Sequence, residues 1–173
     1  MHEFYGKPYD IQGRVAAIGS DSLELFDRLV QHPYLKHRPP KSTGREEFGE
    51  QFVGEFLKHA RGYDREDIIA TASQFTAYAV YDAYTRFVSR RMTADELVVS
   101  GGGARNRFFL DELQRYFAPS RVRRAEDFGV DADAKEAICF AVLANETMAG
   151  HPANLPRVTG ARRRVMLGKI CRP

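Results

Sequence analysis

The chain has 173 residues, of which 43% are hydrophobic and 12% aromatic, enough for one large domain or one half of a two-domain protein. The net charge of +3 is small, and the tight run of basic residues at 162–164 is typical of a solvated loop. No apolar run approaches membrane-spanning length. Two cysteines are too few for a disulfide framework and the histidines show no metal-ligand spacing, so we expect a cytoplasmic protein without a bound metal, membrane partner or nucleic acid.

The first fifty residues contain one irregular segment and one helix. Met1–Gly19 are expected to be irregular, because glycines interrupt the segment, and either to pack on something else or to continue a structure that began earlier, because it has no hydrophobic face of its own. A helix is then predicted from Asp21 to Pro33, with Asp21 and Glu24 as its capping box.

A compact polar cluster opens the next predicted helix. Thr43 and Glu46 have capping-box spacing, and the helix should continue to about Ala60. Plain capping and solvated charges explain the cluster, while a ligand site is the functional alternative. The candidate residues are Lys41, Ser42, Gly44 and Arg45.

The longest helix is predicted from Asp64 to about Arg90, with apolar and tyrosine positions on more than one side. Leu97–Val99 follow as an apolar run typical of a strand covered on both faces. A glycine turn then leads into an amphipathic helix that ends near Phe117, with Asn106 as a good N-cap.

This strand, turn and helix have the pattern of an anion or nucleotide site, because glycines let the backbone approach a ligand and a helix N-terminus attracts negative charge. A tight turn without a ligand explains the glycines equally well. The candidate nucleotide-binding residues are Gly101, Gly102, Gly103 and Asn106.

The last third is predicted as a weak strand (Arg121–Ala125), a helix (Asp133–Ala149) and a short strand at 165–170. In the first turn of that helix, Glu136 has the spacing of a capping partner of Asp133, which is favoured over a role in a cleft. Alternating strands and long helices favour an α/β fold. The core face of the helix is predicted to contain Ile138, Ala141, Val142 and Met148.

Four stretches together resemble the bacterial anhydro-N-acetylmuramic acid kinases in their order and approximate spacing. The resemblance extends from about Tyr5 to Pro173, and the four stretches are specific as a set although the triple glycine alone is not. They are K-S-T-G-R-E (Lys41–Glu46), V-V-S-G-G-G-A-R-N (Val98–Asn106), D-A-K-E-A (Asp133–Ala137) and N-L-P-R-V-T-G-A (Asn154–Ala161).

This resemblance implies one lobe of the actin-like (ribonuclease H-like) ATPase fold, a mixed sheet with flanking helices. It implies a kinase that uses ATP with Mg²⁺, opens the 1,6-anhydro ring of anhydro-N-acetylmuramic acid with water and phosphorylates O6 during peptidoglycan recycling. By resemblance, the three glycines and Asn106 lie at the nucleotide site and Glu136 assists catalysis at the sugar site. A homodimer is also implied.

The chain departs from the family in length, because family members are about twice as long. Their phosphate loop and general-base aspartate precede the part that Met1 begins. Residues 1–173 are therefore expected to be a C-terminal lobe whose N-terminal lobe is absent. We expect this lobe to be inactive alone and to need the N-terminal lobe or a second copy as its partner. An apolar surface that such a partner covers is expected to be exposed.

Two other functions remain open from the sequence. A fragment of another carbohydrate kinase would keep the triple glycine but would not explain Lys41–Glu46 or the V-T-G-A stretch. A non-catalytic domain that binds nucleotide or a partner would account for the missing base.

Overall fold

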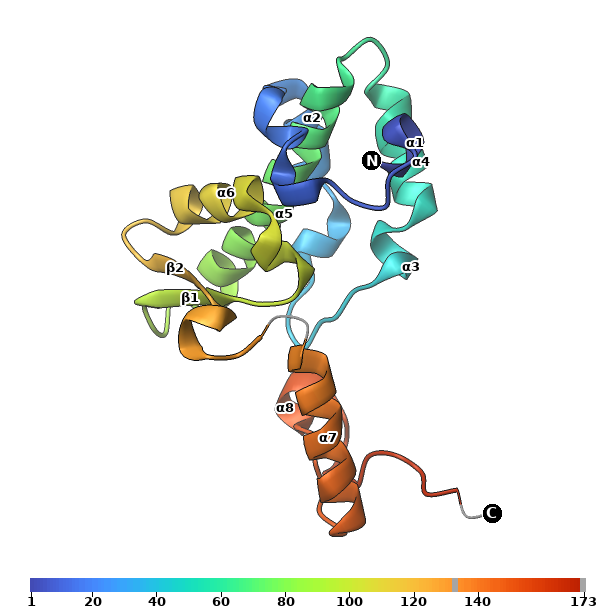
Figure 1. Ribbon diagram of the computed structural model, residues 1–173, viewed down its shortest axis with the longest axis vertical. Helices are drawn as coiled ribbons and strands as arrows, with labels where there is room; N and C mark the ends of the chain where they lie inside the picture. The colour runs from blue at the N-terminus through green and yellow to red at the C-terminus, as the bar shows by residue number, and fades with distance from the viewer. Residues whose placement is uncertain (132–133, 172–173) are drawn as a thin grey trace.

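The computed structural model describes residues 1–131 and 134–171. Its helices and strands form a body from which one long helix, α7, projects like an arm, with the C-terminal tail beside it (Figure 1). The α-helices are α1 (His2–Tyr5), α2 (Leu23–Val30), α3 (Arg45–Phe48), α4 (Glu50–His59), α5 (Arg65–Phe87), α6 (Arg107–Phe117), α7 (Ala134–Met148) and α8 (Pro156–Thr159). The strands are β1 (Glu96–Val99) and β2 (Arg121–Arg124). Short 3₁₀ helices are η1 (Ile11–Gly13), η2 (Ala16–Ile18), η3 (Pro33–Lys36), η4 (Gly102–Arg105) and η5 (Ala125–Phe128).

Helix α5 is the centre of the body and confirms the prediction of the longest helix, although it ends at Phe87. It packs against α2 and η2 on one side and α6 on another. Ala77 is fully buried against Leu113 and Phe117 of α6. Because Ala77 is small, α6 can approach α5 closely at this point. Helix α5 is therefore buried on the side of α6 as well as on the side of α2 and η2, and has no single apolar stripe.

The two strands form a parallel sheet in which Leu97 lies opposite Val122. Leu97, Val99 and Val122 pack towards α5 and α6, so the α/β prediction is confirmed. The predicted coverage of both faces is wrong, because Val98 is 51% exposed. The mixed sheet is also not found among the described residues, where the sheet has two parallel strands.

The N-terminal segment is more regular than predicted, since it contains α1, η1 and η2. The Asp10 carboxylate accepts hydrogen bonds from the backbone N–H groups of Val15 and Ala16, and so shapes the entry to η2. Ala16 is then fully buried against Ile69 and Ala70 of α5. The segment thus packs on α5 of the same chain, which is the first of the two alternatives.

The two capping boxes predicted before residue 50 are wrong. The N-cap of α2 is Ser22, while the Asp21 carboxylate accepts a hydrogen bond from Gln74 Nε2 at 2.8 Å. The N-cap of α3 is Gly44, which has no side chain, so Thr43 and Glu46 form no box. The helix expected to reach Ala60 is broken into α3 and α4 at Gly49. Both helices therefore start one residue later than the local pattern predicted.

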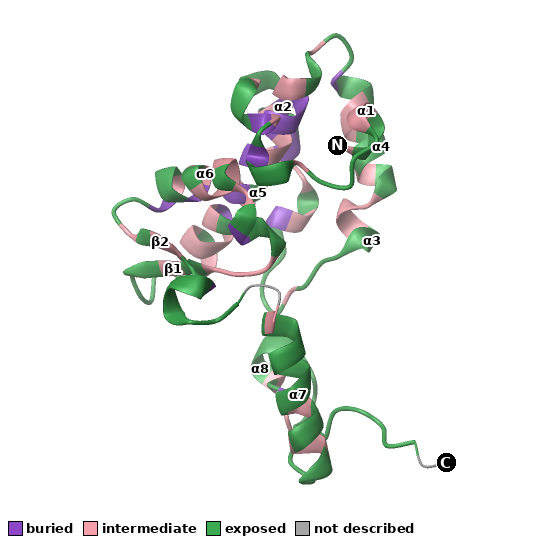
Figure 2. Ribbon diagram, viewed as in Figure 1, coloured by how far each residue is buried: buried purple, intermediate pink, exposed green. Residues whose placement is uncertain are grey.

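Helix α7 has the predicted position, but none of its described residues is buried (Figure 2). Its predicted core face is wrong, because Ile138, Val142 and Met148 are 51%, 55% and 73% exposed and Ala141 is exposed too. The segment 165–170 is not a strand but coil, which contacts Thr147 near the end of α7 before the tail leads away from the helix (Figure 1). No helix within the described ranges has the length and apolar character needed to cross a membrane.

Candidate functional site

Two of the sequence motifs are in contact where α7 joins the body, and a third lies next to a residue that precedes the fourth. Lys135 Nζ, in the first turn of α7, donates a hydrogen bond to Ser100 Oγ at the end of β1, over 2.9 Å. Beside Lys41, the Pro40 ring lies against Gly160, where a Cβ would come within 3.4 Å of the ring. The first contact joins the glycine motif to the D-A-K-E-A motif, and the second joins V-T-G-A to Pro40, the residue before K-S-T-G-R-E.

The glycine turn faces open space. Gly101 has φ +77°, which favours glycine, and a Cβ built on Gly101 or Gly102 meets no atom within 4 Å. At its end, the Asn106 side chain accepts a hydrogen bond from the Phe109 backbone N–H at 3.0 Å, which confirms the predicted N-cap of α6. The turn is therefore accessible to a ligand and leads directly to a helix N-terminus.

A hollow of about 920 Å³ lies beside this turn, between the N-terminal segment and α6. Sequence reasoning missed it, because its residues come from distant segments. Four arginines and one aspartate line the hollow, so the positive charge of its lining is as large as the net charge of +3 of the whole chain. Such a lining attracts anions. The lining includes Tyr9, Gly13, Arg14, Arg105, Arg107, Phe108, Asp111 and Arg124.

Gly13 connects the N-terminal segment to the glycine motif. Its φ is +72°, and a Cβ there would overlap Asn106 Oδ1 and lie 2.7 Å from Phe108 Cβ. Only glycine fits this approach, because its lack of a side chain also permits the left-handed backbone. The cap of α6 is thus held from outside by η1. The R-N-R run around Asn106 was the one sequence signal for this corner.

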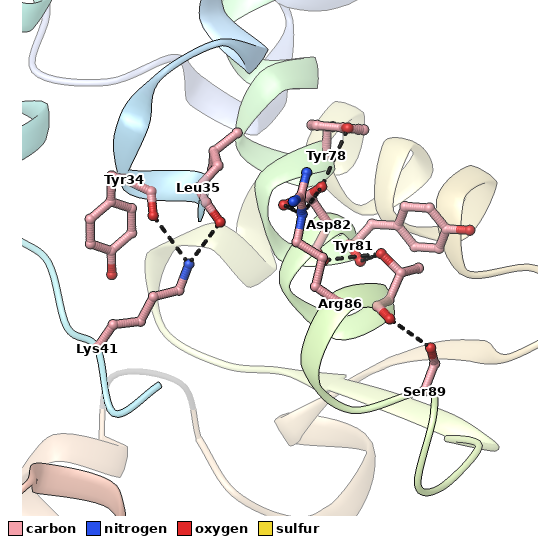
Figure 3. Close-up of polar contacts among 9 residues, drawn as sticks. Tyr34, Leu35, Lys41, Tyr78, Tyr81, Asp82, Arg86 and Ser89 are labelled. Carbon is pink, nitrogen blue, oxygen red and sulfur yellow. Dashed lines mark hydrogen bonds and ion pairs between the residues drawn. The ribbon is translucent and has the colours of Figure 1, made fainter. Parts of the chain in front are cut away.

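Lys41 turns inward from the linker before α3, as Figure 3 shows. Its ammonium donates to the backbone carbonyls of Tyr34 and Leu35, each at 3.4 Å, and lies 4.7 Å from the centre of the Tyr34 ring. Burial lowers the pKa of Lys41, and the nearby Asp82 carboxylate opposes this shift. The other three candidates of this cluster are exposed, Ser42 and Gly44 in the linker and Arg45 at the start of α3.

A buried carboxylate lies on the side of α5 towards Lys41 (Figure 3). Asp82 accepts hydrogen bonds from Arg86 Nε at 2.8 and 2.7 Å, and its side chain is 7% exposed. Burial raises the pKa of Tyr78, whose hydroxyl lies 3.5 Å from Asp82, and the negative carboxylate adds to the effect. Nothing in the sequence singled out the Asp82–Arg86 pair, because an acid and a base four residues apart usually pair on a helix surface.

The whole chain matches one family model, that of anhydro-N-acetylmuramic acid kinase, over residues 1–173. The chain belongs to this family. It is 45% identical over 171 residues to the anhydro-N-acetylmuramic acid kinase of Salinibacter ruber (strain DSM 13855 / M31), which covers 98% of the chain and 43% of the relative. An anhydro-N-acetylmuramic acid kinase of Bacillus cereus is 40% identical over 168 residues, 96% of the chain and 44% of the relative.

Membership of the anhydro-N-acetylmuramic acid kinase family confirms the resemblance carried by the four motifs. The chain spans less than half the length of the curated relatives it matches. In this family member, Glu136 is exposed in the first turn of α7, one residue from the Lys135 contact with Ser100. Its predicted capping partner, Asp133, lies outside the described residues.

Amine labelling should show a lowered pKa for Lys41. Because burial disfavours the charged ammonium, Lys41 should react with an acylating reagent at lower pH than an ordinary lysine does, and Asp82→Asn should lower the midpoint further. Labelling across a pH series, read residue by residue by mass spectrometry, measures this. Glu55→Gln, which removes a carboxylate paired with Lys58, is the matched control and should leave the Lys41 midpoint unchanged. A midpoint that Asp82→Asn raises would contradict the assignment.

Proposed function

We propose that this chain supplies the nucleotide- and sugar-binding side of a kinase for anhydro-N-acetylmuramic acid. The complete enzyme would open the 1,6-anhydro ring with water and transfer a phosphoryl group from ATP to O6, in cytoplasmic recycling of peptidoglycan. Its architecture would be one lobe of an actin-like ATPase. The contact of Lys135 with Ser100, which brings the first turn of α7 to the glycine turn, is the observation that supports this proposal most.

In this proposal, the turn at residues 101–103 lines the adenosine side of the ATP site, and Asn106 holds the start of α6 beside it. The arginine-lined hollow next to the turn supplies positive potential for phosphates. Mg²⁺ accompanies ATP and is held largely by the phosphates. Residues 1–131 and 134–171 contain no group of three or more His, Cys, Asp or Glu that could hold a metal ion.

The sugar side is proposed to lie at the first turn of α7. Water that attacks the anhydro ring must lose a proton to a base, and an exposed carboxylate such as Glu136 can orient that water or accept sugar hydroxyls. The main base is the aspartate that the family resemblance places outside this chain. Phosphoryl transfer needs phosphates, nucleophile and base in one arrangement, so the chain alone should bind without turning over.

Reconstitution tests this function. The chain would be assayed with ATP and anhydro-sugar, alone and after co-expression with the part of the Salinibacter ruber relative that lies outside the match. We expect turnover only from the combined sample. A combined sample that forms a complex and still yields no phosphorylated sugar would contradict the proposal, and turnover by the chain alone would contradict the need for a second lobe.

Gly102→Val should weaken nucleotide binding in that combined sample by at least about tenfold, because the new side chain points into space that the ligand needs. The chain itself should fold normally, since a Cβ at Gly102 meets no atom within 4 Å. Titration with a fluorescent ATP analogue measures the affinity. Gly54→Val, at an equally open glycine of α4, is the matched control and should bind as the unmodified chain does. Equal affinities of the two variants would place the nucleotide elsewhere.

A further inference from the structure

The arginine-lined hollow beside α6 has an unbalanced charge that the neighbouring hollow does not share. Four arginines and one aspartate line this larger hollow of about 920 Å³. A smaller hollow of about 310 Å³ shares Asp111 and Arg124 with it. In the smaller hollow, Asp111 and Asp127 balance Arg123 and Arg124. The excess of positive charge therefore belongs to the larger hollow.

Two arginines of the larger hollow form no salt bridge in the part of the chain that the structure describes. Arg14 donates to the neutral Gln12 Oε1 at 3.2 Å, and Asp127 accepts the backbone N–H of Arg124 while its carboxylate pairs with Arg123. Guanidinium groups gathered around one hollow repel one another, and an anion bound between them removes this repulsion. The lining is thus suited to a ligand with more than one negative charge.

The larger hollow also has an apolar part, and its shape is fixed. Tyr9 and Ile11 line it and are 65% and 53% exposed. Phe108 lines it too and is held in place by Gly13, where a Cβ would lie 2.7 Å from Phe108 Cβ. A preformed hollow with charged and apolar parts is typical of a site for a small molecule.

The glycine turn and the larger hollow face different sides of the start of α6. Residues 101–103 do not line the hollow, and a Cβ at Gly103 would lie 3.4 Å from the Phe109 ring. The hollow is lined by Phe108 instead, and adjacent residues of an α-helix project about 100° apart. A ligand in the hollow therefore does not need the position that the proposed function gives to adenosine.

We propose that the larger hollow is a second ligand site, for a phosphorylated small molecule with two or more negative charges. Arginine suits such a ligand because its planar guanidinium donates two parallel hydrogen bonds to phosphate oxygens. The site goes beyond the proposed function, in which the hollow is only a source of positive potential. Two kinds of molecule share this chemistry, an inorganic polyphosphate and a sugar phosphate. The ring of a sugar phosphate would lie against Tyr9 and Phe108.

Calorimetric titration of the chain itself tests the second site. The probes are inorganic tripolyphosphate and N-acetylglucosamine 6-phosphate, at about 0.1 M salt, where exposed charges more than about 10 Å apart are largely screened. We expect at least one probe to bind one-to-one, and Arg14→Gln and Arg124→Gln should each weaken it at least about tenfold. The matched control is Arg121→Gln, which removes the same charge from an exposed position of β2 outside the hollow and should bind as the unmodified chain does.

Tyr9→Ser distinguishes the two kinds of ligand. If the sugar phosphate is the tighter ligand, Tyr9→Ser should weaken it and leave tripolyphosphate unchanged, which assigns the site to a sugar phosphate. If tripolyphosphate is the tighter ligand and Tyr9→Ser has no effect on it, the site is assigned to an inorganic polyphosphate. Either result supports the second site.

Three outcomes would overturn it. They are no binding of either probe, an equal loss with Arg121→Gln, and a loss of probe binding in Gly102→Val, which would place the anion at the glycine turn. The effect of Gly102→Val on nucleotide affinity in the combined sample tests the proposed function separately, so the two proposals can fail independently. Because Arg14 and Arg124 are exposed, circular dichroism should show an unchanged body in both variants.

Discussion

Glu136→Gln in the reconstituted kinase is expected to lower turnover by at least about a hundredfold, the lower end for a positioned acid–base group. Glutamine keeps the size of the side chain and removes its capacity to take a proton or carry charge. The free energy of unfolding should fall by less than about 1 kcal/mol, since a glutamine in the first turn can still serve a cap. Turnover with ATP and anhydro-sugar, and thermal unfolding of the same sample, are measured together.

The exposed position of Glu136 makes this a discriminating test, because the structure gives the carboxylate no place in a core that its loss would disrupt. Glu146→Gln, on the same helix and about three turns away, is the control. Near-normal turnover of Glu136→Gln would leave the residue without a catalytic role. A fall shared by Glu146→Gln would point to a change in the whole helix.

Gly13→Ala should destabilise the body by about 3 kcal/mol, from the sum of left-handed backbone strain and overpacking. The added Cβ would overlap Asn106 Oδ1 and lie 2.7 Å from Phe108 Cβ, so either η1 or the start of α6 must move. Denaturant unfolding followed by circular dichroism measures the loss. Asn106→Ala combined with Gly13→Ala should be non-additive, because the two changes act on one contact.

Gly102→Ala is the control for this experiment. It places a methyl group in open space at a glycine of the same motif, and the free energy of unfolding should change by no more than about 0.5 kcal/mol. Equal stability of Gly13→Ala and Gly102→Ala would show that η1 does not hold the cap of α6.

The features that local sequence predicts well are those whose cause is local. The Asn106 cap lies before a clean amphipathic helix, and the strand before it is an apolar run bounded by glycine. The caps near Asp21 and Thr43 were predicted wrongly, because the Asp21 carboxylate is engaged by Gln74, far along the chain, and because Gly44 takes the N-cap position of α3 without a side chain. Neither effect leaves a signature in the capping residues themselves.

The candidate site could be predicted only in part for a similar reason. The motifs identified the glycine turn and the first turn of α7, but the contact that joins them, Lys135 to Ser100, depends on tertiary structure. The arginine-lined hollow was invisible because Arg14 and Arg124 are far apart in sequence. The core face of α7 was predicted from its apolar residues. Such residues indicate that a helix is covered, but they do not identify the part of the molecule that covers it.

The contrast between α5 and α7 has a consequence for how stability is distributed along the chain. Helix α5 cannot open without exposing the body, whereas none of the described residues of α7 is buried and its 15 residues are near the length at which an isolated helix is marginal in water. Local opening of α7 therefore costs little free energy. Its amide hydrogens exchange through this local opening, whereas those of α5 exchange only when the body opens. A single melting temperature therefore describes the unfolding of the body and not that of α7.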